Sequence, residues 1–334
     1  EKSRNENDAR GKQLKAAWKA AGFPFTEIDG SWLEKDEDGN EVRVIEKSIV
    51  VTDEQRGDVE RGESDLFEMA KELQLDLDAR RRRKIFAESR GPQNIEEAYA
   101  LQRALRKYRE SRGEIVIGFK IGFTSAGVRQ KANKVMGLYE SVHGYLWDSE
   151  SFPNNSRADH QRLGIEGELL ITLLSISDQD PANWEIAYEP IIELHIVGAS
   201  DSTMWDGPAT DNEGKRGLEL IGSNCIHAGV IRANSSIKCK LAEVPILEPL
   251  TLQVNNKEIE RVTLAELKVG DLLGPLATLS WLLAKLKSEG NGEERLIKTG
   301  SQILCSTPGA LHRVFQGDQL AVNFQKIETT CIVK

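Results

Sequence analysis

The sequence is poor in the features that mark disulfide-stabilised, zinc-binding and membrane-spanning proteins. Its four cysteines are widely spaced and form no Cys-x-x-Cys pair, so zinc and a disulfide framework are not expected, and buried thiols in a reducing compartment are. No apolar run approaches the ~18 residues that a membrane-spanning helix requires. A net charge of −9 argues against nucleic acid as the main partner. The chain starts at Glu1 rather than Met, so the lack of a targeting signal is uninformative. The expected reducing compartment is the cytoplasm or an organelle matrix, and the sequence does not distinguish between them.

The composition is that of a soluble globular protein, with 39% hydrophobic and 29% charged residues. A length of 334 residues exceeds a typical domain, and we predict an accessory N-terminal extension over 1–64 and one large domain over 65–334. In the extension, Trp32–Lys35 and Glu41–Ile45 flank a Gly-Asn turn that is typical of a hairpin. The extension has no chemistry of its own, and its tryptophans indicate that it docks on a protein partner.

Two segments have the periodicity of helices. The first runs from Asn94 to Arg112, where Glu97 completes a capping box and Gly113 ends the helix. The second runs from Pro275 to Glu289, and proline suits a first helical turn. The other segments are mostly short strands, including a hairpin around Asn255-Asn256. Many strands and few helices predict an α+β fold, a mixed β-roll with flanking helices, rather than an alternating βαβ fold.

Two glutamates interrupt the apolar strand-like segment from Ile165 to Leu174. Because side chains alternate along a strand, Glu166 and Glu168 lie on the same face, about 7 Å apart. Adjacent carboxylates repel each other and are costly to remove from water, so a compensating group is required. A divalent cation would supply it. The opposite face is expected in the core and carries Ile165, Leu169, Ile171 and Leu173.

A second apolar segment carries another glutamate, Glu193. With Glu166 and Glu168 it predicts a three-carboxylate metal site. The alternatives are that these glutamates pair with Arg or Lys, or lie on a solvated face of the sheet. His195 lies two residues after Glu193 and therefore on the same face. It is interpreted as an additional ligand, a donor to a ligand, or a packed histidine.

Lys120 is an ammonium group within an apolar strand, flanked by Gly118 and Gly122. A buried lysine must pair with a carboxylate or lose its proton. It can therefore be a structural salt bridge, or a proton shuttle or carboxylate anchor beside the metal site. His143 follows a turn and either faces a cleft or is structural. The basic run at residues 80–84 has no aromatic residues within it, which favours a solvated helix end over a phosphate site.

Taken together, an ordered series of motifs resembles the fumarylacetoacetate hydrolase superfamily, and most closely its 2-hydroxypentadienoate hydratase and 4-oxalocrotonate decarboxylase branch. The resemblance covers roughly 65–334. The matching motifs are Glu97–Gln102, Gly118–Ser125, Gly144–Leu146, Glu166–Glu168, Ile192-Glu193, Gly222–Asn224, Leu273–Pro275 with Trp281-Leu282, and Gly317-Asp318.

This resemblance implies a mixed β-roll that binds Mg²⁺ or Mn²⁺ and forms homo-oligomers. The family's metal ligands match Glu166, Glu168 and Glu193, its catalytic lysine matches Lys120, and its substrate-binding asparagine matches Asn224. We place Ser223 and His143 in the same substrate-binding group. The implied activity is that of a metal-dependent lyase, a hydratase or decarboxylase, which acts on a small anionic 2-keto or 2-hydroxydienoate acid through a metal-bound enolate.

The sequence also departs from the family pattern. Val142 and His143 stand where such hydratases often have an acidic residue, and Cys225-Ile226-His227 replaces a small serine-containing run. Two alternatives to the lyase therefore stay open. One is a non-catalytic structural or interaction subunit that kept the fold and docks through residues 1–64. The other is an acylpyruvase-type C–C hydrolase with His143 or His195 as its base.

Overall fold

The structure is a computed structural model, which describes residues 26–28, 31–35, 41–44, 53–79, 83–87, 90–125, 127–129, 137–158, 163–176, 179–196 and 213–334. The chain divides into two compact units, and each is described by itself. One consists of Glu1–Arg61 with Gly270–Leu272, and the other of Gly62–Val269 with Leu273–Lys334.

The first unit contains a three-stranded antiparallel sheet in the order β1-β2-β3. Its strands are β1 (Thr26–Ile28), β2 (Ser31–Lys35) and β3 (Glu41–Val44). The predicted hairpin is confirmed, because β2 pairs with β3 from Trp32 opposite Val44 to Lys35 opposite Glu41.

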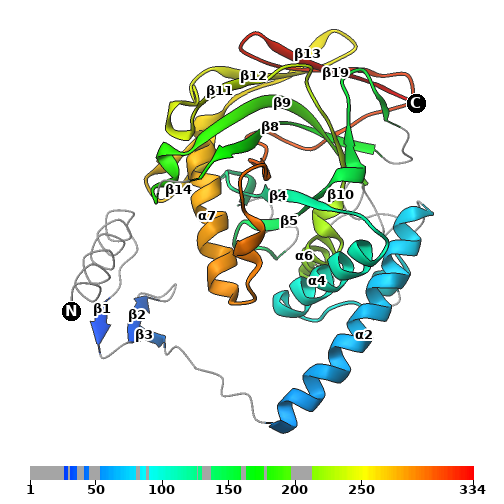
Figure 1. Ribbon diagram of the computed structural model, residues 1–334, viewed down its shortest axis with the longest axis vertical. Helices are drawn as coiled ribbons and strands as arrows, with labels where there is room; N and C mark the ends of the chain where they lie inside the picture. The colour runs from blue at the N-terminus through cyan, green and yellow to red at the C-terminus, as the bar shows by residue number, and fades with distance from the viewer. Residues whose placement is uncertain are drawn as a thin grey trace. The chain divides into compact units, whose positions relative to one another are not determined.

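The second unit is built around a mixed nine-stranded sheet, whose order is β5-β4-β16-β8-β9-β10-β6 with β11 beside β9 and β17 beside β8. Two long strands, β8 and β9, form its centre and arch across the unit (Figure 1). The strands are β4 (Val116–Gly122), β5 (Val142–Trp147), β6 (Ser151–Phe152), β8 (Leu163–Ser175), β9 (Glu185–Ile196), β10 (His227–Ile231), β11 (Ile237–Lys240), β16 (Gln302–Leu304) and β17 (His312–Arg313).

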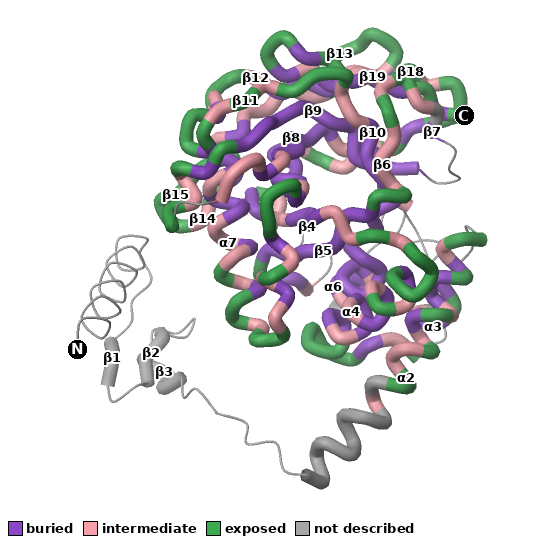
Figure 2. Tube along the Cα trace, in the orientation of Figure 1, coloured by how far each residue is buried: buried purple, intermediate pink, exposed green. Residues whose placement is uncertain are grey.

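A five-stranded sheet in the order β13-β12-β18-β19-β7 packs on one face of β8 and β9. The interface between the sheets is buried (Figure 2). It includes the four apolar residues of β8 that the sequence assigned to the core, and each of them is 0% exposed: Ile165, Leu169, Ile171 and Leu173. The predicted turn at Asn255-Asn256 joins β12 to β13. These strands are β7 (Arg157–Ala158), β12 (Pro249–Val254), β13 (Lys257–Thr263), β18 (Gln319–Phe324) and β19 (Ile327–Val333), with a separate pair β14 (Lys268–Val269) and β15 (Leu272–Leu273).

Helices α4, α6 and α7 lie beside the large sheet (Figure 1). Asn94 caps α4 through its Oδ1, which accepts a 2.8 Å hydrogen bond from Glu97 N, as predicted. Pro275 lies in the first turn of α7 and Gly290 ends it in the left-handed conformation. The helices are α2 (Asp53–Asp78), α3 (Lys84–Ala87), α4 (Ile95–Ser111), α6 (Glu213–Gly222) and α7 (Gly274–Glu289), and the 3-10 turns are η1 (Asp148–Glu150), η2 (Pro181–Asn183), η3 (Asn224–Ile226), η4 (Leu241–Glu243), η5 (Leu264–Glu266) and η6 (Glu293–Leu296).

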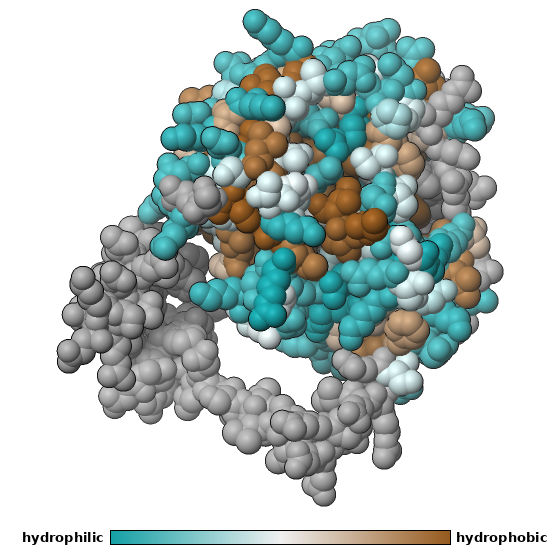
Figure 3. Space-filling view, viewed as in Figure 1, coloured by the Kyte–Doolittle hydropathy of each residue, from teal (hydrophilic) through white to brown (hydrophobic). Residues whose placement is uncertain are grey.

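This arrangement confirms the predicted fold class, a mixed α+β β-roll with flanking helices. Strands that are distant in the sequence, such as β8 and β16, pair within one curled sheet. Among the residues that the structure describes, every helix is too short or too polar to span a lipid bilayer. On the face seen in Figure 3, hydrophobic side chains gather near the middle and hydrophilic ones surround them.

The prediction that residues 80–84 form a solvated helix end is wrong at Arg83. This side chain is 2% exposed and donates hydrogen bonds of 3.2 Å to Glu219 Oε1, Ser223 Oγ and Ile196 O. A guanidinium can be buried when carboxylate and carbonyl acceptors surround its fork of donors. Arg83 therefore ties the chain before α3 to α6 and to the end of β9. Residues 80–82 lie outside the described residues.

Gly167 separates the two glutamates of β8 at a point where the second sheet passes close by. A Cβ atom at this position would lie 3.3 Å from Val322 Cγ2. Gly167→Val is therefore expected to force the sheets apart and to lower the free energy of unfolding by about 1–3 kcal/mol, with Gly167→Ala costing less. Urea unfolding of both variants measures the effect, and an unchanged midpoint for the valine variant would contradict it.

Candidate metal centre and active site

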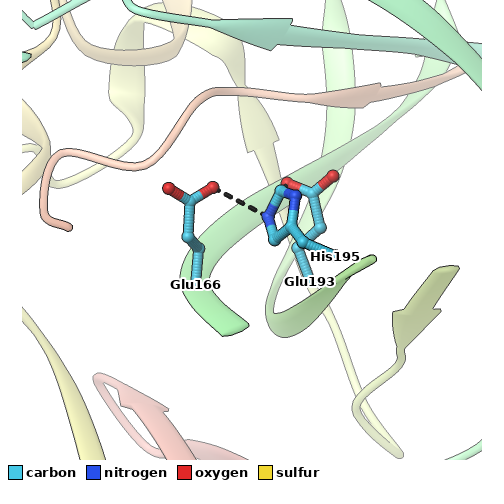
Figure 4. A group of neighbouring side chains, drawn as sticks. All are labelled: Glu166, Glu193 and His195. Carbon is cyan, nitrogen blue, oxygen red and sulfur yellow. Dashed lines mark ion pairs between the residues drawn. The ribbon is translucent and has the colours of Figure 1, made fainter. Parts of the chain in front are cut away.

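Strand register brings the acidic residues together on one face of the large sheet. Glu166 on β8 lies directly opposite Glu193 on β9, and Glu168 and His195 each lie two residues further along their strands. Side chains two residues apart on a strand share a face. Glu166, Glu193 and His195 are drawn in Figure 4, where the His195 ring faces Glu166 beside Glu193.

Three of these residues form a cluster that could hold a metal ion. One ligand atom from each of Glu166, Glu193 and His195 lies within 4.8 Å of the others. His195 Nε2 is 2.9 Å from Glu166 Oε2 and 3.4 Å from Glu193 Oε2. The cluster therefore contains two of the three predicted carboxylates together with a histidine, while Glu168 lies beside it and interacts with Glu193.

One oxygen of Glu193 is held firmly while the other is not. Lys120 Nζ, from β4, donates a short hydrogen bond to Glu193 Oε1 and a longer one, 3.5 Å, to Cys225 O. His227 Nδ1, at the start of β10, lies 2.7 Å from the same Oε1 atom. The predicted pairing of Lys120 with a carboxylate is thus present, and it leaves Glu193 Oε2 directed at the cluster.

Burial and the neighbouring charges set the protonation of this group. Burial alone would lower the pKa of Lys120, but Glu193 outweighs it, so that pKa is raised. Burial alone would raise the pKa of Glu193, but His195 and Lys120 hold it well below its ordinary value. Burial raises the pKa of Glu168 well above its ordinary value, and Glu193 and Glu166 raise it further. These shifts favour the ammonium form of Lys120, the carboxylate form of Glu193 and the protonated form of Glu168.

Four buried polar atoms around the cluster test whether a cation fits there. Within the described part of the chain, Glu168 Oε2, Glu193 Oε2 and both ring nitrogens of His195 have no hydrogen-bond partner. Buried polar atoms are ordinarily paired, and each unpaired one is unfavourable. Carboxylate oxygens and an imidazole nitrogen are also metal ligands. The residues present therefore fit a divalent cation.

A cavity of about 230 Å³ opens beside the cluster. Its polar wall is formed by Lys120, Glu166, Glu168 and His195 together with Ser306 and Thr307 from the loop between β16 and β17. The rest of its wall is mainly apolar and comprises Ile121, Gly122, Phe123, Val128, Val142, Leu220, Cys225, Ile226, Gly309, Ala310 and Leu311. Such a site suits a small molecule with one polar and one apolar end.

The loop that contributes Ser306 and Thr307 was not singled out in the sequence. Ser306 has a φ of 72°, a left-handed conformation that is uncommon outside glycine. Thr307 Oγ1 donates to Gly167 O at 3.3 Å and accepts from Gly309 N at 3.1 Å. These contacts fix the loop against the strand that carries Glu166. A short run of small polar residues is also typical of ordinary turns, so the sequence held no distinguishing signal.

The side chain of Asn224, which was predicted to bind substrate, forms hydrogen bonds with the backbone of Tyr145. Its Oδ1 accepts from Tyr145 N at 2.7 Å and its Nδ2 donates to Tyr145 O at 2.9 Å. Gly144 makes this approach possible, because a Cβ there would lie 2.7 Å from Asn224 Oδ1. Asn224, Cys225 and Ile226 all have φ values between 53° and 58°. This strained turn places the last two in the cavity wall and Asn224 behind it.

Ser223 and His143 also lie away from the cavity lining. Ser223 Oγ donates to Glu219 O at 2.7 Å. The His143 ring stacks on Tyr99 with centroids 4.7 Å apart, and its Nε2 lies 3.1 Å from Glu289 Oε1. A substrate-binding role for Asn224, Ser223 and His143 stays a prediction, and in this structure each has a structural contact instead.

The four cysteines are all free thiols, in agreement with the sequence. Cys225 is the one that borders both Lys120 and the cavity. Burial raises its pKa to about 12. Because the thiolate is the reactive form, Cys225 contributes to the wall of the cavity and is not a nucleophile at neutral pH.

No protein-family model matches the chain. Among solved structures, it is similar to 4-oxalocrotonate decarboxylase from Pseudomonas putida G7 complexed with magnesium and adipate, at 18% identity and a TM-score of 0.65 over 81% of this chain and 98% of that one. The same decarboxylase complexed with calcium and acetate matches at 19% identity and a TM-score of 0.61, over the same shares. The chain therefore has the fold of the fumarylacetoacetate hydrolase superfamily, as the ordered motifs predict.

Proposed function

We propose that this protein is a divalent-cation-dependent lyase, a hydratase or decarboxylase, which acts on a small 2-keto or 2-hydroxydienoate acid. The observation that carries the proposal is the set of buried ligand atoms of Glu168, Glu193 and His195 without hydrogen-bond partners, beside a cavity whose wall contains Lys120, Glu168 and His195. The two similar decarboxylase structures are complexed with magnesium or calcium and with a carboxylic acid, which supports this choice of cofactor and substrate class.

Glu166 and Glu193 would hold the cation, with Glu168 as the third carboxylate ligand predicted from the sequence. When bound, Mg²⁺ or Mn²⁺ would act as a Lewis acid toward the oxygens of a 2-keto acid. The protein prepares this site by fixing Glu193 Oε1 through Lys120 and His227, so that Oε2 keeps one direction. Ligand orientation of this kind commonly controls metal affinity.

Lys120 is the residue that we assign to proton handling. Its Nζ lies in the cavity wall and keeps its proton at neutral pH, because Glu193 outweighs the effect of burial on its pKa. In that state it can donate a hydrogen bond to the substrate carboxylate or deliver a proton to a carbanion carbon. It cannot serve as the initial base, which is a role for a neutral amine.

The remainder of the cavity would orient the substrate and exclude water. Ser306 and Thr307 supply hydroxyl groups near the carboxylate cluster, and the apolar wall covers the opposite end. When water is excluded from the cavity, the electrostatic interactions of Lys120 and the acidic residues with the substrate become stronger. A cavity of about 230 Å³ suits a small substrate. We also propose that the protein forms a homo-oligomer and that residues 1–64 bind a protein partner.

The proposal is tested by assaying a panel of 2-keto and 2-hydroxydienoate acids. Loss of dienoate absorbance reports hydration and release of CO₂ reports decarboxylation. Turnover of at least one acid is expected, together with its loss in EDTA and its recovery on addition of Mg²⁺ or Mn²⁺. Turnover that is unchanged by EDTA, or its absence across the panel with the cation bound, would contradict the proposed function.

The cavity also predicts which acids are preferred. Lys120 and His195 are the basic residues among its described lining, and both belong to the carboxylate cluster. A second carboxylate at the far end of a substrate would therefore be desolvated without a counter-charge. We expect kcat/KM at least about tenfold higher for 2-keto acids with an alkyl tail than for their dicarboxylic analogues. Leu311→Arg should narrow or reverse this ratio, and a ratio that favours the dicarboxylates in the unaltered enzyme would contradict it.

A further inference from the structure

We infer that His195 is a nitrogen ligand of the cation, and that the site therefore selects first-row transition ions such as Mn²⁺ and Co²⁺ over Mg²⁺ and Ca²⁺. The inference rests on the proposed function, because it concerns the same cation. It adds a ligand to the three carboxylates predicted from the sequence, and it names the class of ion that this ligand favours.

The position of His195 follows from the register of the two central strands. It lies on the same face of β9 as Glu193 and opposite Gly164 of β8, which is two residues before Glu166. Its Nε2 atom is 2.9 Å from Glu166 Oε2 and 3.4 Å from Glu193 Oε2. Figure 4 shows the ring beside Glu193 and facing Glu166. The ring therefore lies among the carboxylates rather than behind them.

His195 is buried without a hydrogen-bond partner among the described residues, although its Nε2 atom lies close to two carboxylates. The residue is 3% exposed, yet neither ring nitrogen makes a hydrogen bond of acceptable geometry. Its approach to Glu166 is close in distance but not aligned as a hydrogen bond. Buried imidazole nitrogens ordinarily have partners. Oxygen and nitrogen atoms that converge without hydrogen-bond alignment are arranged as ligands of one ion would be.

His227, the second histidine near the cluster, has a different role, and the contrast supports the assignment of His195 as a ligand. His227 Nδ1 contacts Glu193 Oε1 at 2.7 Å, and its Nε2 lies 3.8 Å from Glu150 Oε2. His227 therefore orients a ligand, as an outer partner does. His195 instead contacts Glu193 through Oε2, the oxygen that Lys120 and His227 leave available.

The presence of an imidazole changes which cation the site prefers. Mg²⁺ and Ca²⁺ are hard ions that take oxygen ligands. Imidazole nitrogen favours transition ions, and affinity for them rises along the series from Mn²⁺ to Co²⁺. A site in which an imidazole joins these carboxylates is consequently better suited to Mn²⁺ or Co²⁺ than the carboxylates alone would be.

Electron spin echo envelope modulation of the Mn²⁺-loaded protein tests the inference directly. A coupling to ¹⁴N of a bound imidazole is expected in the unaltered protein and is expected to disappear in His195→Gln. His143→Gln provides a matched control, because it removes a buried histidine outside the cluster and should keep the signal. By calorimetry, His195→Gln should bind Mn²⁺ and Co²⁺ at least about tenfold more weakly, with less than about threefold change for Mg²⁺.

The outcomes separate this inference from the proposed function. Mn²⁺ that binds without a ¹⁴N coupling, or an equal loss of Mg²⁺ and Co²⁺ affinity in His195→Gln, would overturn the nitrogen ligand and leave the cation-dependent enzyme standing. Failure of the unaltered protein to bind any of these ions would overturn both.

Discussion

Glu193→Gln is expected to weaken cation binding by at least about a hundredfold and to abolish cation-dependent turnover. His195 and Lys120 hold the pKa of Glu193 well below its ordinary value, and its Oε2 atom lies 3.4 Å from His195 Nε2. A neutral amide removes that charge, and the loss should exceed the 10–100-fold effect typical of changes to residues that only support a ligand. Calorimetric titration with Mn²⁺ measures the change.

Glu189→Gln is the matched control for this experiment. Glu189 is also a buried glutamate of β9, but its carboxylate accepts from Arg232 Nε and Ala233 N, each at 2.9 Å, away from the cluster. Its substitution should leave Mn²⁺ affinity unchanged. Equal affinities of Glu193→Gln and the unaltered protein would show that Glu193 is not a ligand.

The same substitution should destabilise the cation-free protein. Glu193 is the charged partner of Lys120, which is 4% exposed. Breaking a buried ion pair from one side ordinarily costs about 3–5 kcal/mol, because the other charge stays buried. Urea unfolding of Glu193→Gln should show a loss of that size, and the double variant with Lys120→Met should recover part of it. A double variant that is less stable than Glu193→Gln would contradict this interpretation.

Cation affinity is expected to increase with pH through the titration of Glu168. Burial and the adjacent carboxylates raise the pKa of Glu168 well above the ordinary 4.5, so the cation-free protein keeps this proton at pH values where an exposed glutamate has lost it. A carboxyl group must be deprotonated to bind a metal. Below the raised pKa, each unit decrease in pH should therefore weaken binding about tenfold, and above it this dependence should level off.

Proton release during Mn²⁺ binding, measured by calorimetry in buffers of different ionisation enthalpy, tests this dependence. The unaltered protein should release about one proton more per bound ion than Glu168→Gln does. Glu168→Gln should also have the shallower dependence of affinity on pH. Identical proton release by the two proteins would mean that Glu168 does not bind the cation.

The acidic cluster could be predicted because it depends on two simple regularities. Alternation along a strand places Glu166 and Glu168 on one face, and a glutamate within a second apolar strand is unusual enough to be noticed. The sequence could not give the register that sets Glu193 opposite Glu166. That register depends on how the two strands pair. The same register places His195 in the cluster, a position that the sequence left open among several interpretations.

Residues outside that pattern were harder to predict because their positions depend on the fold around them. Asn224 matches a family motif, yet three successive left-handed residues turn it toward Tyr145 and place Cys225 and Ile226 in the cavity. Arg83 stands in a basic run that looks solvated, and only its contacts with α6 and β9 explain its burial. Ser306 joins the site through a loop between two short strands of the sheet.

Anomalous diffraction from crystals of the protein soaked with Mn²⁺ and oxalate, an analogue of a 2-keto acid enolate, tests the central claim most directly. A single strong peak is expected within about 2.0–2.6 Å of carboxylate oxygens of Glu166 and Glu193, with oxalate in the cavity beside Lys120. Absence of a peak at these residues at saturating Mn²⁺, with their side chains placed as described here, would contradict the proposed metal centre.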